Sequence, residues 1–390
     1  VGDEIDNLFF FFLIISASHV ANGSTRVMCT SAHGGAVIGE AAALCLKHDS
    51  PVSFYADKDN VKELRLALEE RGHFVPGFCE TDTENLLNTA DVSASSVWKF
   101  MGFEATEYRV LEHSAALMLP VSGKLPAFTV SLEADEDTAI TVSVRVSDKS
   151  QNYAPERTLA SIELNVKSGR SVYNIDFGVE LPQMENVFIT FSKNSKVKIG
   201  VTDRLAAGVT TVFNQINEAV SNYGRQEASE NSGFESFEFW CPLRRPYSYN
   251  LALQFSEPME LFSVDGLKNA YKRPYNGTNA WSADPQDNNP KVSVSWKDVQ
   301  EIKRVVLFFD NDHDQAMEPI QHGHYDNIMP QCVRSYRIYD ASGCIVYESK
   351  ENHLGMNEIK FSAPVYTDKL SIELDHAPQA SATLFHIILK

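Results

Sequence analysis

The residues best suited to chemistry gather near the amino-terminal end of this 390-residue sequence. Gly35, Gly39 and Ala43 recur every four positions there, shortly after His19 and Arg26. Residues four apart lie on one face of a helix. Because each glycine inside a helix costs ~1 kcal/mol relative to alanine, two on one ridge indicate that something approaches the helix backbone closely.

Two interpretations of this ridge stay open. The helix either packs tightly against a strand, or stands beside a flat cofactor or its phosphates. The second fits a helix start, where free N–H groups and the helix dipole favour anions. His33, at the predicted helix start, is interpreted as a structural residue.

The elements before the ridge are predicted from polarity. Leu8–Ile15 is continuously apolar and predicts a buried strand, which is too short to span a bilayer. Asp3, Glu4 and Asp6 precede it where a signal peptide would carry positive charge. A loop is predicted over 22–26, followed by the small-residue helix.

This segment carries a family resemblance, in the run NLFFFFLIISASHVANGSTRVMCTSAHGGAVIGEAAALC. The run resembles the closing motif of the FAD-dependent oxidoreductase family of Bacteroidetes-type bacteria, and the resemblance implies that it lies against the flavin end of FAD. His19 would then hydrogen-bond the flavin and Arg26 would hold negative charge; alternatively, both satisfy backbone carbonyls in a buried loop. The implied cofactor-side residues are Ser16, Ser18, His19, Arg26, Thr30, Gly35 and Gly39.

The chain departs from that family in two ways. Phe12 and Leu13 stand where the family has Gly-Arg, which removes close backbone approach and a charge for phosphate. The G-x-G-x-x-G turn of the nucleotide-binding unit does not occur in the sequence. We therefore predict the carboxy-terminal part of such an oxidoreductase, inactive alone. FAD is the cofactor of the full-length family, and we expect none bound to this chain.

The remainder predicts a mainly β protein. Helix signals stop near residue 90, and short runs rich in β-branched and aromatic residues follow at regular spacing, as in sandwiches. We predict a helical remnant of a flavin-binding domain over 1–90 and two antiparallel β-sandwiches over 91–257 and 258–390. The stretch 212–220 has spacing that also suits one or two helical turns.

The second sandwich resembles discoidin-like, galactose-binding-like jelly-roll modules. The resemblance rests on Asn-x-x-x-Arg-Pro followed by Asn-x-Trp, at Asn269–Pro274 and Asn279–Trp281. Aromatic faces cover sugar rings, so we predict a ligand site at this loop end, with His322–Tyr325 as a further contributor. Alternatively, the aromatic residues fill the core and Arg273 pairs with Asp310. The predicted ligand-binding residues are Tyr271, Arg273, Tyr275, Asn279 and Trp281.

Composition limits the partners. A net charge of −18 argues against nucleic acid and anionic membranes, both of which need clustered Lys and Arg. The alternating acids 310–314 lack the glycine and terminal Glu of an EF-hand, and His322-Gly323-His324 has poor spacing, so no metal site is predicted. The six cysteines contain no C-x-x-C pair and predict mostly free, buried thiols.

Two functions from different classes follow. The chain is either part of a flavin oxidoreductase or a non-catalytic protein whose sandwiches bind a glycan or another protein. Because the apolar run Leu8–Ile15 needs cover, we also predict that it packs on the second sandwich, is held by the helix Gly35–Leu46, or forms a homo-oligomer contact. The compartment, periplasm or cytoplasm, stays open.

Overall fold

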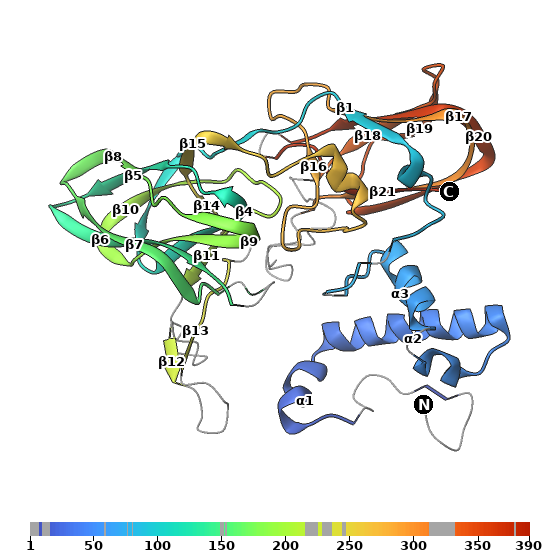
Figure 1. The fold of residues 1–390 in the computed structure, drawn as a ribbon, viewed down its shortest axis with the longest axis horizontal. Helices are drawn as coiled ribbons and strands as arrows, with labels where there is room; N and C mark the ends of the chain where they lie inside the picture. Colours follow the sequence, from blue (N-terminus) through green and yellow to red (C-terminus); the bar gives the residue numbers. More distant parts are fainter. Residues whose placement is uncertain are drawn as a thin grey trace. The chain divides into compact units, whose positions relative to one another are not determined.

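The chain is mainly β with a helical start, which confirms the predicted fold class (Figure 1). It divides into two compact units, Val1–Asn85 and Leu86–Lys390. The computed structural model describes residues 8–9, 16–57, 60–75, 77–79, 81–148, 152, 154–214, 225–227, 236–243, 247–311, 332–377 and 380–390.

The amino-terminal unit is helical and has a small core. Its helices are α1 (His19–Thr25), α2 (Met28–His48) and α3 (Val61–Glu70), with the 3-10 turn η1 (Val52–Ala56) between the last two. Side chains at the end of α2 contact α3: the Nζ of Lys47 and the Nε2 of His48 lie 3.4 Å and 2.8 Å from the Oε1 of Glu63. The core consists of Ala41, Leu44, Cys45, Val52, Tyr55, Leu64 and Leu68, with Phe9 packed against it.

One local prediction for this unit, the loop over 22–26, was wrong. The stretch predicted as a loop over 22–26 lies mostly in α1, because the Ser18 Oγ accepts a hydrogen bond from the Ala21 N–H at 3.3 Å and caps that helix. Asn60, the N-cap residue of α3, makes no side-chain capping hydrogen bond, and its Nδ2 donates to the Phe54 carbonyl at 2.9 Å. Of the predicted strand Leu8–Ile15, residues 10–15 lie outside the described residues.

The first sandwich is built from two antiparallel sheets. One sheet runs in the order β14-β10-β5-β15-β2, with β3 and β8 also paired to it, and the other runs β11-β4-β9-β6-β7. The bounds are β2 (Phe100–Gly102), β3 (Glu107–Leu111), β4 (Ser114–Lys124), β5 (Phe128–Ala134), β6 (Thr138–Val146), β7 (Arg157–Val166), β8 (Gly169–Ile175), β9 (Glu180–Phe191), β10 (Asn194–Thr202), β11 (Thr210–Asn214), β14 (Asn250–Leu251) and β15 (Leu253–Met259).

Alternating polarity explains why these strands form a sandwich. Val142, Val144 and Val146 of β6 are fully buried in the shared core, whereas Thr141 and Arg145 lie on the other face. Successive strand residues point to opposite faces, so one face of each sheet enters the core. Val212 lies in β11, so the helical turn predicted to begin there was wrong; residues 215–220 lie outside the described residues.

The carboxy-terminal sheet is held by two long strands. It runs β16-β21-β17-β20-β18-β19, and β1, which was predicted to open the first sandwich, pairs with β17. The pairing of β17 with β20 contains register shifts between Ser295 and Gln300 and between Ile302 and Arg304, and bulges of this kind bend long strands. The bounds are β1 (Asp91–Ala94), β16 (Trp281–Ser282), β17 (Lys291–Phe309), β18 (Ser335–Tyr339), β19 (Ile345–Ser349), β20 (Met356–Asp375) and β21 (Thr383–Leu389).

The two β regions share buried surface. Along β17, Leu307 and Phe309 face the carboxy-terminal core, whereas Val306 and Phe308 join the core of the first sandwich. Both faces are therefore buried at the end of this strand, over 305–309, which explains the unbroken apolar sequence there. The predicted boundary between residues 257 and 258 falls inside this unit and stays a prediction.

Short elements complete the described chain. They are η2 (Leu86–Thr89), η4 (Val264–Lys268) and the two-stranded sheet of β12 (Arg225–Glu227) and β13 (Ser236–Glu238). No helix among the described residues is both long and apolar enough to cross a lipid bilayer.

Candidate functional site

The predicted cofactor-side residues lie on α1 and α2. Ser16, Ser18 and Arg26 are exposed around α1, and Thr30 is exposed in the first turn of α2. Arg26 is the C-cap of α1, so it stands directly before the start of α2. His19 begins α1, and its side chain lies outside the described part.

The glycine ridge of α2 is open at Gly39. Gly39 is exposed, and Gly35 is half-buried. An added Cβ at Gly34 or Gly39 would meet no described atom within 4 Å. At Gly39, therefore, no described neighbour packs against the ridge, while both interpretations stay open at the half-buried Gly35.

The open side of α2 also carries large apolar residues. Met28 is 81% exposed and Leu46 is 85% exposed, while Ala41 and Leu44 are buried on the other side of the same helix. Isolated exposed apolar residues are ordinary, but these two lie along the same side as the glycines. The helix thus has one covered face and one small, apolar face that is open.

The start of α2 suits negative charge. Its N-cap is Val27, which makes no side-chain cap hydrogen bond, and its first turn has no acidic residue. The first N–H groups of a helix have no partner within the helix and carry the positive end of the dipole. Arg26 and Thr30 add a guanidinium and a hydroxyl at the same end.

The predicted ligand loop is braced from inside. Asn279 has a positive φ of 53° and donates to the Tyr275 carbonyl at 2.8 Å. It also accepts from the Asn269 Nδ2 at 2.9 Å. The amide of Asn279 therefore braces the loop, and a contact between Asn279 and a ligand stays a prediction.

The aromatic residues of this loop divide into two kinds. Tyr271 and Tyr275 are half-buried and stack on each other, with ring centres 5.3 Å apart. Trp281 is fully buried, and its Nε1 donates to the Ser96 carbonyl at 2.8 Å. The prediction of Trp281 as a ligand-binding residue is corrected: the ring has no face open to a ligand. Arg273 is half-buried, and His322–Tyr325 lie outside the described residues.

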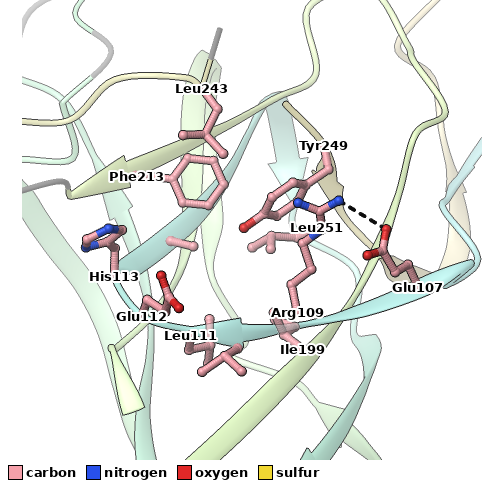
Figure 2. Close-up of a pocket in the computed structure, with 12 residues that line it drawn as sticks. Glu107, Arg109, Leu111, Glu112, His113, Ile199, Phe213, Leu243, Tyr249 and Leu251 are labelled. Atoms are coloured by element: carbon pink, nitrogen blue, oxygen red, sulfur yellow. Dashed lines mark hydrogen bonds and ion pairs between the residues drawn. The ribbon is translucent and has the colours of Figure 1, made fainter. Parts of the chain in front are cut away.

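A cavity that the sequence did not predict lies in the first sandwich, beside β3 (Figure 2). Its volume is about 520 Å³. Figure 2 shows Arg109 reaching toward Tyr249, with Glu112 and His113 across the space from them. The apolar residues that line it are Val110, Leu111, Ala115, Ile199, Phe213, Leu243 and Leu251.

Arg109 is positioned by two contacts in this cavity. Its Nη2 lies 3.2 Å from the Glu107 Oε2, and its guanidinium carbon lies 4.6 Å from the centre of the Tyr249 ring. Tyr249 in turn meets Phe213 edge-on, with ring centres 5.3 Å apart. Burial raises the pKa of the Tyr249 phenol, so it keeps its proton at neutral pH.

The sequence carries little signal for this cavity. Arg109, Phe213 and Tyr249 belong to distant parts of the chain and meet only because β3, β11 and the segment before β14 come together at one end of the sandwich. Glu112 and His113 stand at the turn between β3 and β4. This polar pair is the one local sequence feature that indicates the position of the cavity.

Thiols and metals add no site. All six cysteines are free, but the prediction that most are buried was wrong: Cys45 and Cys332 are buried, Cys79 and Cys241 are half-buried, and Cys29 and Cys344 are exposed. Within the described residues, no group of three or more His, Cys, Asp or Glu side chains gathers as a metal would need. Residues 312–314 and 322–324 lie outside that part of the chain.

Solved structures similar to the chain include carbohydrate-binding modules. The family 32 module of Streptococcus pneumoniae EndoD has 12% identity and a TM-score of 0.27, covering 35% of this chain and 90% of that one. Chitosan-binding module 1 from a Paenibacillus sp. IK-5 chitosanase/glucanase has 14% identity and a TM-score of 0.25, covering 34% and 87%. The C. perfringens NanJ family 32 module, in complex with galactose, has 12% identity and a TM-score of 0.24, covering 34% and 86%.

Sequence comparisons identify the amino-terminal segment. No curated protein sequence matches the chain. Residues 1–68, the stretch that carries the glycine ridge, match the FAD dependent oxidoreductase family, which confirms the resemblance in the sequence.

Proposed function

We propose that this chain is the carboxy-terminal part of a FAD dependent oxidoreductase, in which α2 forms one wall of the flavin domain. The carrying observation is the open face of α2 inside the family-matching segment. Met28 and Leu46 are 81% and 85% exposed there, and Gly39 stands between them with no described atom near its Cβ position. A complete domain would cover such a face with protein or cofactor.

The residues at the start of α2 have a clear task in this proposal. The uncapped N–H groups, Arg26 and Thr30 attract and orient a negatively charged or electron-rich part of the cofactor. The small residues behind them let a flat ring system approach the helix backbone and exclude water from it. The flavin, when bound, supplies the hydride chemistry.

The chain alone is not expected to retain FAD. Its sequence has no G-x-G-x-x-G turn to hold the pyrophosphate at a helix start. Phe12 and Leu13 replace the Gly-Arg pair that the family resemblance implies. The sequence thus contains the helix proposed to lie beside the flavin, but neither the G-x-G-x-x-G turn nor the Gly-Arg pair that would bind the dinucleotide.

A visible absorption spectrum of the purified chain tests this part of the proposal. We expect no flavin absorbance, and no saturable quenching of flavin fluorescence when FAD is added. The variant Arg26→Ala should then behave like the unmodified chain. A yellow protein with near-stoichiometric flavin, lost in Arg26→Ala, would show that the segment binds FAD without a separate nucleotide-binding portion.

A second candidate function is recognition of a hydroxyl-rich ligand by the carboxy-terminal loop. The observation that favours it is the stacked, half-buried pair Tyr271 and Tyr275 on a loop that Asn279 holds rigid. Aromatic faces cover the C–H side of a sugar ring, and Arg273 offers donors to hydroxyls. Loops on a rigid sandwich are common places for recognition.

A glycan screen with the variants Tyr271→Ala, Tyr275→Ala and Arg273→Ala tests this candidate. Loss of binding with an unchanged melting temperature would support recognition. For Arg273→Ala, a large fall in melting temperature without any effect on a bound glycan would support the structural alternative. Tyr366→Ala is the matched control, because Tyr366 is 66% exposed on β20. A chain that binds no glycan in the screen contradicts this second function.

The homo-oligomer contact through residues 8–15 stays a prediction. Phe9 packs against the helical core, and Leu8 is 37% exposed. Sedimentation velocity over a range of concentrations tests it. A monomer at all concentrations would remove this role for the segment.

A further inference from the structure

Three polar groups in the cavity of Figure 2 have no partner. The Glu112 carboxylate, the His113 imidazole and the Tyr249 hydroxyl make no hydrogen bond to any described residue. Tyr249 is half-buried, and its hydroxyl points into the space between Phe213 and Glu112 (Figure 2). Glu112 is exposed at the rim of the cavity, whereas His113 and Tyr249 are half-buried. A half-buried polar group without a partner among the described residues favours a ligand that supplies one.

The charges around the cavity favour a neutral ligand. Arg109 is paired with Glu107 at 3.2 Å, and Glu112 stands across the space from both. A small anion would meet the Glu112 carboxylate, and a small cation would meet the Arg109 guanidinium. A neutral ligand that both donates and accepts hydrogen bonds can bind Arg109, Glu112 and Tyr249 at the same time.

The floor of the cavity favours a ligand with one apolar face. Phe213 and Tyr249 meet edge-on, and Leu111, Ile199 and Leu243 extend the apolar lining. A volume of about 520 Å³ lies within the range of roughly 300–1,000 Å³ that small-molecule sites occupy. Apolar walls with a few convergent polar groups are the usual construction of such a site.

We propose that this cavity binds a neutral saccharide unit. The C–H face of the sugar lies against Phe213, and its hydroxyls donate to Glu112, accept from Arg109 and exchange hydrogen bonds with the Tyr249 hydroxyl. The proposal concerns the first sandwich only. It rests neither on the flavin wall nor on the loop that carries Tyr271 and Tyr275.

Calorimetric titration with neutral disaccharides tests the site, using lactose, cellobiose, maltose and chitobiose as probes. We expect saturable binding of at least one of them by the full chain. Tyr249→Phe and Glu112→Gln keep the shape of the side chains. Tyr249→Phe should weaken that binding roughly tenfold, the effect of one hydrogen bond lost at a half-buried group, and Glu112→Gln, at an exposed residue, should weaken it less. The melting temperature should stay within the range of the unmodified chain.

Matched controls separate this cavity from the carboxy-terminal loop. Tyr366→Phe and Glu163→Gln change exposed residues outside the cavity and should leave binding unchanged. Binding that survives Tyr249→Phe and Glu112→Gln but is lost in Tyr271→Ala would overturn the proposal and assign the sugar to the loop. Absence of binding to all four probes would overturn it as well.

Discussion

The helical unit and the β unit differ in how much of their apolar surface they bury themselves. In the helical unit the core is one small cluster around Leu44, Leu64 and Leu68, while Met28 and Leu46 of α2 are largely exposed. In the β unit, residues 305–309 of β17 bury both faces, and fully buried aromatic side chains such as Trp281 and Phe309 fill the cores.

The difference separates two kinds of information. The helical unit is recognisable from its motif but covers only one face of α2. The β unit carries no strong motif but provides its own cores. Recognisable sequence and self-sufficient packing therefore lie in different regions of this chain.

The largest expected effect is in the β unit. Trp281→Ala should lower its free energy of unfolding by about 3–5 kcal/mol, because a buried ring leaves a cavity and the Ser96 carbonyl loses its donor. Denaturant unfolding followed by β-sheet circular dichroism measures this. Tyr366→Ala, at an exposed site, is the control. A loss below ~1 kcal/mol would contradict the placement of Trp281 in the core.

A second prediction concerns acid stability of the same unit. Burial, with the nearby charge of Lys272, lowers the pKa of His386 to about 4, and its Nδ1 lies 2.7 Å from the Leu267 carbonyl oxygen. In the unfolded chain a histidine titrates near ~6.5, so below that pH the unfolded state binds a proton that the folded state does not. Stability should therefore fall by about 3 kcal/mol as the pH drops from ~6.5 to about 4.

The variant His386→Asn isolates that contribution. Asparagine keeps a donor for the Leu267 carbonyl but does not titrate. The pH dependence of unfolding between about 6.5 and 4 should become shallower by close to one proton. An equally steep pH dependence in the variant would show that other groups cause the acid sensitivity.

The third prediction separates the two units. Leu68 is 3% exposed in the core of the helical unit, so Leu68→Ala should cost about 2–3 kcal/mol. Because that cluster is small, we expect α2 and α3 to lose hydrogen-exchange protection while the β strands keep theirs. Equal loss of protection in both units would show that they unfold together.

The smallest effect is expected on the open face of α2. Leu46→Ser should change stability by at most ~0.5 kcal/mol, since Leu46 is 85% exposed. Leu44→Ser, two residues earlier on the covered face, is the matched control and should be clearly destabilising. If both substitutions destabilise the purified chain equally, the face at Leu46 is already covered and the proposed wall role loses its basis.

Much of the β fold followed from local pattern. Val142, Val144 and Val146 alternate with polar residues, and this period of two predicted both the strand and its buried face. Where tertiary packing decides, the pattern failed. The runs in 291–309 appeared as two strands because residues near Lys297 and Asp298 are polar, yet the sheet bends there and continues as β17.

The sites divide in the same way. The glycine spacing of α2 and the Ser16–Leu44 motif were visible as soon as residues were read in order. The role of Asn279 as an internal brace and the burial of Trp281 depend on contacts with Tyr275 and Ser96 that no spacing reveals. The cavity of Figure 2 needs Arg109 and Tyr249 to meet, which only the pairing of distant strands brings about.

The sequence by itself determined the family of the amino-terminal segment, the helix-to-strand change near residue 90 and the alternation of the sandwich strands, because each depends on residues close together in the chain. Only the tertiary structure decided which face of α2 stays open, which aromatic rings are core, and where a cavity forms. Exposure, burial and cavities depend on which residues pack against one another, and many of those neighbours come from segments that are distant in the sequence.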